Sequence, residues 1–277
     1  MTLWTSTEIA KATGGTATSE FEVAGLSIDT RSLKAGDLFV ALKDARDGHE
    51  FIPAAIEAGA GGVLCEAVSD NTPAVVVPDS AKALEALGVH ARNDRDALRI
   101  GVTGSVGKTS VKEALAVMLS AFETTHKSIK SFNNYLGVPI TLATIPSDAK
   151  YAVLEMGMNH AGEMSGLSKL AKPQIAIINN VVGAHLAHFD SVENIADAKA
   201  EIIDGMEPGG TLILNGDNEY TLRIRKKAIA AKLNVLTFGH SDKDDIAIVS
   251  KNSHSAGGNV RLRIERQQFD VTLMDSG

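Results

Sequence analysis

The sequence predicts an α/β protein with two domains, divided between residues 96 and 97. Three observations support this fold class. From Leu98 onward, apolar strands alternate with helical segments, which is the pattern of a parallel sheet covered on both faces. Before that point, short helices and strands are mixed in a smaller α/β unit. After Gly239 the pattern changes to short alternating strands, which indicate an antiparallel appendage.

Composition limits the kind of protein this can be. The 277 residues are enough for two hydrophobic cores. A net charge of −7 disfavours a nucleic-acid-binding surface, which requires clustered Lys and Arg. No stretch reaches the roughly 18 apolar residues of a membrane span, and the start lacks a secretory signal. The single cysteine, Cys65, excludes an internal disulfide framework. We expect a cytoplasmic, monomeric protein that binds no nucleic acid and inserts in no membrane.

In the first domain, residues 1–96, helices and strands are predicted from apolar spacing and from turn residues. The expected helices cover residues 8–14, 51–60 and 79–94. The last of them begins at Asp79 or Ser80 as N-cap. The expected strands cover residues 37–42, 61–65 and 73–78. The polar stretch at 92–97 is predicted to form the hinge between the domains.

In the second domain, residues 97–277, the alternation is regular. The expected strands cover residues 99–103, 151–155, 174–179, 211–215 and 234–238. The expected helices lie near residues 108–121, 161–171, 193–205 and 218–231. The strands of the appendage are expected at residues 246–250, 260–265 and 269–274.

The stretch GVTGSVGKTS at residues 101–110 joins a strand to a helix, the context in which a phosphate-binding loop is credible. The general pattern G-x-x-x-x-G-K-[ST] requires glycine where this chain has Val102, so we assign Val102 to the strand and begin the loop at Thr103. Lys108 would reach the β- and γ-phosphates of a nucleotide, and the Thr109 hydroxyl would bind Mg²⁺. The alternative is an ordinary glycine-rich turn. The predicted nucleotide-binding residues are Thr103, Gly104, Ser105, Val106, Gly107, Lys108, Thr109 and Ser110.

Three further residues are candidates for the same site. Glu155 ends a buried strand, at the sheet edge where α/β proteins bind ligands and where an acid can hold a metal. His185 follows the next predicted strand and could complete a metal's coordination, although a lone histidine is more often structural and His188 is an alternative. The pattern around Lys199, taken alone, predicts a lysine on a helix whose ammonium group lies in solvent.

The loop G-x-T-G-[ST]-x-G-K-[ST] resembles the ATP loop of the Mur ligases and their folylpolyglutamate synthetase relatives, which use ATP to join a carboxylate to an amine. This resemblance implies catalytic roles for Lys108, His185 and Lys199. It implies that Lys199 is carbamylated by CO₂. It also implies a nucleotide contact at Asn215, with Asp217 as a second candidate; an Asx turn explains either residue equally well. The implied magnesium ligands are Thr109, Glu155, His185 and Lys199.

The N-terminal stretch from Ser27 to Phe51 resembles the UDP-sugar-binding domain of the Mur ligases that add the third residue or D-alanyl-D-alanine. The stretch SFNNYLGVPITL at residues 131–142 resembles the acceptor-substrate loop of the D-alanyl-D-alanine-adding members. For Asp29 and Arg31 the alternative is a surface ion pair. The implied substrate-binding residues are Ser27, Asp29, Thr30, Arg31, Asp47, Gly48, His49, Asn133 and Asn134.

Taken together, these features predict a small N-terminal α/β UDP-substrate domain and a P-loop parallel-sheet ATP-binding domain with a short antiparallel appendage. By resemblance, the substrates would be UDP-N-acetylmuramoyl-tripeptide and D-alanyl-D-alanine, with ATP and Mg²⁺ as cofactors and an acyl phosphate as intermediate. The amine-binding C-terminal domain of complete members is expected to be absent. Three alternatives stay open: a third-residue-adding ligase, a folylpolyglutamate synthetase and a non-catalytic nucleotide-binding fragment. A GTPase-type switch would need an N-K-x-D motif, which the sequence lacks.

Overall fold

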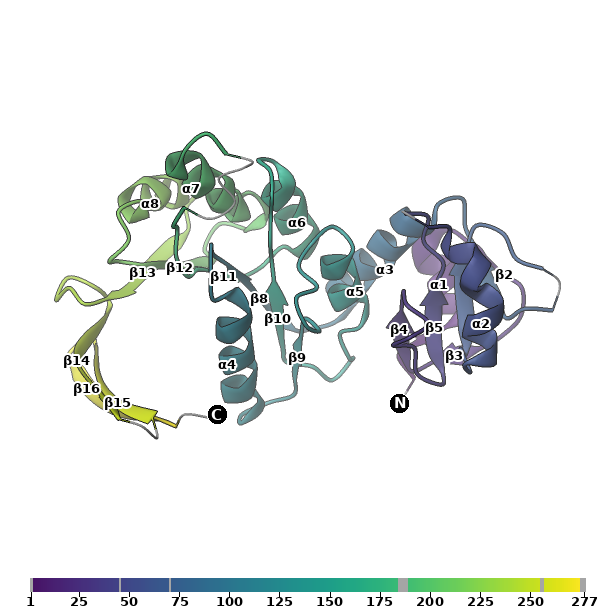
Figure 1. Ribbon diagram of the computed structural model, residues 1–277, viewed down its shortest axis with the longest axis horizontal. Helices are drawn as coiled ribbons and strands as arrows, with labels where there is room; N and C mark the ends of the chain where they lie inside the picture. Colours follow the sequence, from purple (N-terminus) through teal and green to yellow (C-terminus); the bar gives the residue numbers. More distant parts are fainter. Residues whose placement is uncertain (1, 45, 70, 184–188, 255–256, 275–277) are drawn as a thin grey trace. The chain divides into compact units, whose positions relative to one another are not determined.

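A computed structural model describes residues 2–44, 46–69, 71–183, 189–254 and 257–274 (Figure 1). Its contacts divide the chain into two compact units. Unit 1 comprises residues 1–98 and 116–154, and unit 2 comprises residues 99–115 and 155–277. The division therefore passes within three elements, which are β8 (Leu98–Thr103), α4 (Lys108–Ser120) and β10 (Tyr151–Glu155).

Unit 1 is built on a five-stranded sheet. Its order is β2 (Thr16–Ala17), β7 (Ala74–Val76), β6 (Gly62–Cys65), β5 (Asp37–Val40) and β4 (Gly25–Ser27). All neighbours are parallel except β2, which runs antiparallel to β7. A separate antiparallel pair is formed by β1 (Trp4–Thr5) and β3 (Glu22–Val23). In the same unit, β9 (Thr125–Lys127) lies parallel to β10.

The helices of unit 1 differ in whether a side chain caps their first turn. They are α1 (Ser6–Thr13), the 3₁₀ helix η1 (Gly48–Phe51), α2 (Ile52–Glu57), α3 (Ser80–Asp94) and α5 (Gly137–Ala143). Thr5 and Glu8 form a capping box at the start of α1. The Asp79 carboxylate accepts a hydrogen bond from the Lys82 amide at 3.0 Å, so Asp79 rather than Ser80 is the N-cap of α3.

The main core of unit 1 joins the sheet to α1, α3 and α5. It contains Trp4, Ile9, Leu84, Leu87 and Ile140, all buried. The Trp4 indole donates a hydrogen bond to the Ala143 carbonyl at 2.8 Å, which satisfies its polar atom inside the core.

The stretch at 92–97, where the hinge is predicted, lies just before the division between the two units at residues 98 and 99. Its first residues form the last turn of α3, and Arg95 follows as the C-cap. The Arg95 guanidinium lies 5.0 Å from the centroid of the Trp4 ring and donates to the Ile145 carbonyl at 2.5 Å. A cation–π contact and a partly buried hydrogen bond thus anchor this polar stretch to the core of unit 1. Polarity alone could not reveal those partners.

Unit 2 contains a twisted sheet that is parallel through its central strands. From β8 the order continues with β11 (Ile175–Ile178), β12 (Thr211–Asn215) and β13 (Asn234–Gly239). The next strand, β14 (Ile246–His254), pairs parallel with the end of β13. The strands β15 (Gly257–Ile264) and β16 (Gln267–Met274) then add antiparallel. The expected antiparallel appendage is therefore present as an extension of the main sheet.

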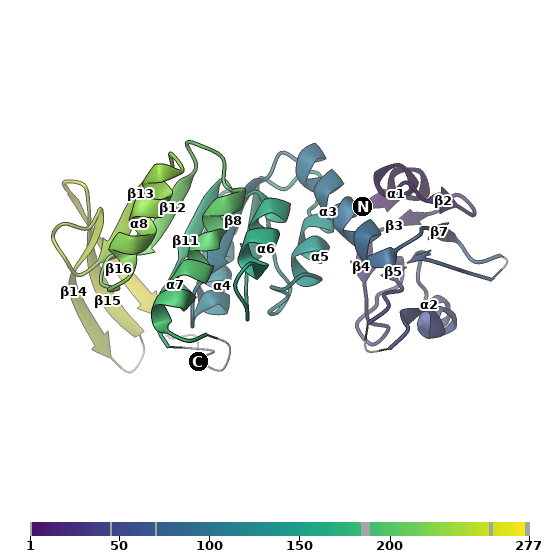
Figure 2. The ribbon, with the colours of Figure 1, turned by 90° about the horizontal axis from the view of Figure 1, so that it is seen from above.

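Helices cover both faces of this sheet. Figures 1 and 2 show α6 (Glu163–Ala171), α7 (Val192–Ala200) and α8 (Thr221–Ala230) on one face and α4 on the other. The expected helix at 193–205 is α7 followed by the 3₁₀ helix η2 (Glu201–Gly205). The strands between the helices are apolar on both sides: Val102, Ile178 and Leu212 are all buried.

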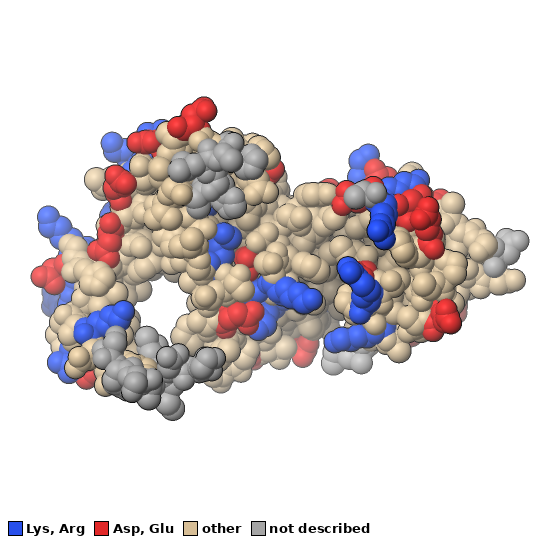
Figure 3. All heavy atoms as spheres, viewed as in Figure 1, with Lys and Arg blue, Asp and Glu red and all other residues tan. Residues whose placement is uncertain are grey.

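The surface carries both signs of charge. On the face drawn in Figure 3, Lys and Arg are interspersed with Asp and Glu. Within the described ranges, none of the helices has the length and apolar character required to cross a bilayer. The single cysteine, Cys65, is buried in β6.

Candidate functional site

The glycine-rich loop lies at the C-terminal edge of the parallel strands in unit 2. β8 ends at Thr103 and α4 begins at Lys108, so residues 104–107 make the turn. β11 pairs with β8 in parallel up to Ile178 opposite Thr103, which brings the residues after β11 beside the loop. This edge is where open α/β sheets bind their ligands.

The loop exposes a set of amides at the N-terminus of α4. The first helical hydrogen bond is from the Val111 amide to the Gly107 carbonyl, at 3.0 Å. Within the described part of the chain, the amides of Gly107, Lys108, Thr109 and Ser110 have no protein acceptor. Unpaired amides at the positive end of a helix dipole form an anion-binding site.

Two backbone amides of the predicted nucleotide-binding loop donate hydrogen bonds to protein groups. The Ser105 amide donates to the Asn180 carbonyl at 3.0 Å, and the Val106 amide donates to Asn180 Oδ1 at 3.1 Å. The Ser105 and Val106 amides therefore have protein acceptors, and the nucleotide-binding role predicted for these two residues stays a prediction. The sequence carried no signal for this, because the partner is 74 residues away.

Lys108 folds back over the loop. Its ammonium donates to the Gly104 carbonyl at 2.8 Å and lies 3.5 Å from the Ser105 carbonyl. Burial lowers the pKa of Lys108 from its ordinary value, and the nearby Glu155 carboxylate opposes that shift. The ammonium is thus held at the loop, where a phosphate chain would exchange with these two carbonyl oxygens.

Glu155 is the buried acid of the site. Its side chain is 1% exposed at the end of β10. The Thr109 hydroxyl donates to Glu155 Oε2 at 3.0 Å, and the Lys112 ammonium lies 3.5 Å from the same oxygen. Lys112 is 0% exposed and also lies 3.1 Å from Glu113. We did not anticipate Lys112, although its place one helical turn after Lys108 was a usable signal.

The donor set fits magnesium only in part. Mg²⁺ prefers oxygen ligands, and the Thr109 hydroxyl and Glu155 carboxylate are oxygen ligands held side by side. No group of three or more His, Cys, Asp or Glu able to hold a metal occurs within the ranges that the structure describes. His185, an expected ligand, lies outside the described residues, as does its alternative His188.

Lys199 is buried in α7, with 3% of its surface exposed. The interpretation of Lys199 as a helix lysine with a solvated tip is therefore wrong. Burial lowers the pKa of Lys199 from 10.5 to about 7, and the positive charge of Lys108 adds to this shift. An ammonium cannot bind a cation. At pH 7, however, a substantial fraction of the Lys199 side chain is the neutral amine. The neutral amine can attack CO₂ and thereby acquire a carboxylate.

Asn215 and Asp217 form the turn after β12. Asn215 Oδ1 accepts the Asp217 amide at 3.0 Å, which is the Asx turn considered as the alternative. The Asp217 carboxylate accepts from the His240 amide at 2.9 Å and lies 2.7 Å from His240 Nδ1. Both polar side chains are therefore engaged in holding the end of the strand.

Most of the expected substrate residues of unit 1 also have local partners. Asp29 and Arg31 form an exposed ion pair at 2.7 Å, and the hydrogen bonds from Arg31 lower the pKa of Asp29 to about 2. Thr30 lies between them. The Asn134 carboxamide oxygen accepts the Gly137 amide at 3.0 Å just before α5, beside Asn133.

The loop at residues 47–49 is held by its own side chains. His49 Nε2 accepts the Glu66 amide at 2.8 Å, so the ring proton is on Nδ1, which lies 2.6 Å from Asp47 Oδ1. Both ring nitrogens are thus occupied by the protein. A Cβ at Gly48 would lie 2.5 Å from the Leu42 carbonyl oxygen, which explains the glycine by packing.

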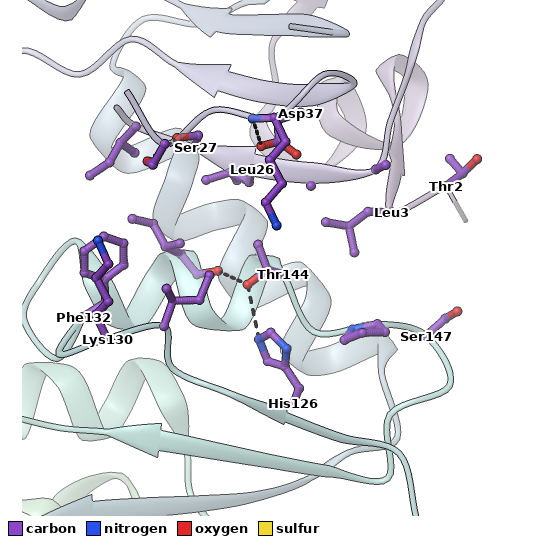
Figure 4. A pocket seen from close by; sticks show the side chains of 18 residues that line it. Thr2, Leu3, Leu26, Ser27, Asp37, His126, Lys130, Phe132, Thr144 and Ser147 are labelled. Atoms are coloured by element: carbon purple, nitrogen blue, oxygen red, sulfur yellow. Dashed lines mark hydrogen bonds between the residues drawn. The ribbon is translucent and has the colours of Figure 1, made fainter. Parts of the chain in front are cut away.

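Unit 1 contains a cavity of about 510 Å³ (Figure 4). Leu26, Ser27 and Asp37 line one side, and His126, Lys130 and Phe132 line the other. Lys34 is also in its wall. Of the expected substrate residues only Ser27 lies here. His126, Lys130, Lys34 and Phe132 were missed, because their convergence depends on the packing of α5 against the N-terminal core.

Burial lowers the pKa of His126 to about 4, so the imidazole in this wall is neutral at pH 7. Its Nε2 lies 2.9 Å from the Thr141 carbonyl oxygen, which requires the proton on Nε2. The cavity therefore combines apolar walls, a neutral imidazole and two lysines.

Comparison with known proteins places the two units in one family. The sequence matches the Mur ligase middle domain over residues 102–275 and the Mur ligase family, catalytic domain, over residues 22–91. It is 35% identical over 275 residues to the UDP-N-acetylmuramoyl-tripeptide–D-alanyl-D-alanine ligase of Rickettsia prowazekii, covering 98% of this chain and 61% of that protein. It is 39% identical over 218 residues to the Bacillus subtilis protein of the same name, covering 76% of this chain and 48% of that one.

Solved structures agree with the sequence comparisons. MurF from Acinetobacter baumannii superposes with a TM-score of 0.84 at 30% identity, covering 99% of this chain and 61% of that one. MurF from Thermotoga maritima in complex with ADP gives a TM-score of 0.75 at 27% identity, covering 90% of this chain and 58% of that one. The chain thus spans about 61% of the length of the first of these relatives. The chain belongs to the Mur ligase family.

Proposed function

We propose that this chain carries the ATP site and the UDP-substrate site of a ligase that adds D-alanyl-D-alanine to UDP-N-acetylmuramoyl-tripeptide. One observation carries the proposal. The amides at the start of α4, which have no acceptor among the described residues, adjoin the Lys108 ammonium and the Thr109–Glu155 hydrogen bond, in a chain 35% identical to a ligase of that name. Anion donors beside oxygen ligands suit a magnesium-bound triphosphate.

The proposed reaction is an ATP-driven amide synthesis. The tripeptide carboxylate would attack the γ-phosphorus of ATP, forming an acyl phosphate and releasing ADP. The D-alanyl-D-alanine amine would then attack the acyl carbon and expel phosphate. Catalysis of the first step requires alignment of the carboxylate and neutralisation of the transferring group. Lys108 and the α4 amides would supply that positive potential.

Magnesium would be held by Thr109 and Glu155, together with His185 and a carbamylated Lys199. When bound, it would neutralise charge on the phosphate oxygens. The lowered pKa of Lys199 supports the carbamylation, because the reaction needs the neutral amine. Asn215 stays a candidate nucleotide contact by family resemblance, although its side chain closes the Asx turn and its carbonyl accepts the Thr221 hydroxyl.

The cavity of unit 1 is our candidate for the UDP part of the substrate. Its apolar wall, including Leu26 and Phe132, suits a nucleobase, and Lys34 and Lys130 suit a diphosphate. This assignment keeps Ser27 and adds residues that sequence patterns did not indicate. We also propose that the protein is cytoplasmic, because nucleotide-linked precursors and ATP share that compartment. We propose separately that it is a monomer.

An ADP-release assay tests the proposal. The chain is mixed with ATP, Mg²⁺ and UDP-N-acetylmuramoyl-tripeptide, with and without D-alanyl-D-alanine. We expect Lys108→Ala to abolish any release. Binding of ADP without dipeptide-stimulated release would favour the second candidate, a non-catalytic nucleotide-binding module that uses the same α4 amides. ADP affinity that is unchanged in Lys108→Ala would contradict both.

A further inference from the structure

The peptide group between Val106 and Gly107 is held by two asparagines that follow β11. The Val106 carbonyl accepts from Asn179 Nδ2 at 3.0 Å and from Asn180 Nδ2 at 3.2 Å. Asn180 Oδ1 accepts the Val106 amide at 3.1 Å. One carboxamide therefore binds both the N–H and the C=O of Val106, and the other reinforces the C=O.

Fixing this carbonyl also fixes the next amide. All described peptide bonds are trans, so the Val106 C=O and the Gly107 N–H point in opposite directions from one peptide plane. With the oxygen bound to Asn179 and Asn180, the Gly107 N–H is directed away from them. No described protein group accepts it there. It is one of the four amides at the start of α4 for which the described residues offer no acceptor.

The 106–107 peptide needs these hydrogen bonds because glycine, which has no Cβ, restricts backbone rotation very little. Gly107 has φ +77°, a conformation that glycine adopts without steric penalty. Rotation of the 106–107 peptide about its flanking bonds is accordingly cheap. A flipped peptide would turn the Val106 carbonyl oxygen, rather than the Gly107 N–H, toward a bound phosphate, and the two negative groups would repel each other.

We propose that Asn179 and Asn180 are positioning residues that set the Val106–Gly107 peptide so that its N–H faces the phosphate chain. The inference rests on the proposed function, since it requires a phosphate chain at the loop. It also explains why a glycine is required at 107: a Cβ there would lie 2.9 Å from Asn179 Nδ2.

Because both asparagines donate to the same Val106 carbonyl, single and double substitutions should affect ADP affinity differently. Asn179→Ala leaves the Val106 carbonyl bonded to Asn180, so we expect at most a twofold loss of ADP affinity. Asn180→Ala leaves the bond to Asn179 and is expected to cost a few-fold. The double variant frees the carbonyl, and we expect affinity to fall by about tenfold or more, exceeding the product of the single effects.

Isothermal calorimetry with ADP on the full chain measures these affinities. Asn234→Ala is the matched control, because Asn234 Nδ2 donates to the Gly209 carbonyl at 2.8 Å at the opposite end of the strands. It removes the same kind of bond and should leave ADP affinity unchanged. If the double variant binds ADP as the wild type does, the positioning role is refuted while the proposed function stands. If Lys108→Ala also binds normally, or the wild type binds no ADP, both fall.

A second measurement does not depend on whether the double variant folds. In the labelled wild type, NMR should detect scalar coupling across the hydrogen bonds from the two side-chain amides to the Val106 carbonyl carbon. The Gly107 amide signal should shift on ADP addition while those couplings persist. Loss of the couplings in the ADP complex would overturn the proposal, because the peptide would then have another orientation when phosphate is bound.

Discussion

Replacing Lys199 with methionine tests the electrostatics of the candidate site directly. The side chain is 3% exposed, and its pKa is lowered from 10.5 to about 7 by burial and by the charge of Lys108. Methionine keeps most of the apolar stem and removes the titrating group. We expect Lys199→Met to be more stable than the wild type at pH 7 and to lose a pH dependence that the wild type has.

The magnitude follows from proton linkage. Between pH 7 and 10.5 the unfolded chain keeps the proton on Lys199, whereas the folded chain releases it, so the free energy of unfolding rises with pH. Below pH 7 both states are protonated, and the folded chain carries the full cost of a buried ammonium. At about 1.4 kcal/mol per pKa unit, this cost is about 5 kcal/mol.

Urea unfolding between pH 6 and pH 10, without nucleotide or Mg²⁺ and in buffers freed of CO₂, measures the effect. Removing CO₂ is essential, because a carbamylated lysine no longer titrates as an amine. The stability advantage of Lys199→Met should be largest below pH 7 and should shrink toward pH 10. Lys226→Met, on the exposed face of α8, is the control and should show no such trend.

A difference between Lys199→Met and the wild type that is constant from pH 6 to pH 10 would refute the reasoning. It would mean that the amine is hydrated in the folded chain. The same samples supplied with ¹³C-bicarbonate provide a companion test of carbamylation: a new carbamate resonance should appear in the wild type and in the control variant but not in Lys199→Met.

Three other predictions concern stability. Lys112→Met should cost about 3–5 kcal/mol in urea unfolding, because Glu155 would keep its buried charge without the ammonium 3.5 Å away, and adding Glu155→Gln should recover part of that loss. His126, with its pKa lowered from 6.5 to about 4, stabilises the fold only while neutral; stability should fall by about 3 kcal/mol between pH 6.5 and pH 4, and the fall should be smaller by that amount in His126→Gln. Trp4→Phe should lower the free energy of unfolding by about 1–3 kcal/mol, because the Ala143 carbonyl loses its indole donor, whereas an unchanged urea midpoint would show that the bond contributes nothing.

Sequence patterns predicted the parts of the fold that depend on local order. The strand–loop–helix unit from β8 to α4 was predictable because apolar alternation, two glycines and a lysine occur within one short stretch. The same holds for α3, whose apolar spacing and N-cap are local. Very short strands such as β1 and β3 were not predicted, because two-residue strands carry no periodicity and exist only through their partners.

The site was predictable only where its chemistry is local. The unpaired amides from Gly107 to Ser110 follow from the start of a helix, and Glu155 from the end of a strand. The engagement of the Ser105 and Val106 amides by Asn180 depends on which strand lies beside β8, and sequence order does not give that neighbour. Burial of Lys199 likewise results from tertiary packing rather than from its own helix.

The distribution of charge explains why these separate features suit one kind of ligand. At the candidate site, Lys112 and Lys199 are buried and Lys108 is partly so, and the buried carboxylate described beside them is that of Glu155. A folded chain tolerates such an excess of buried cations only at a cost, and the lowered pKa values of Lys108 and Lys199 express that cost. A polyphosphate bound at the α4 amides would supply the missing negative charge and favour the protonated amines. Neutral Lys199 is therefore a property of the site without nucleotide. If carbamylation occurs by reaction of that amine, it must precede nucleotide binding, because the phosphate charge both protonates the amine and repels the carbamate.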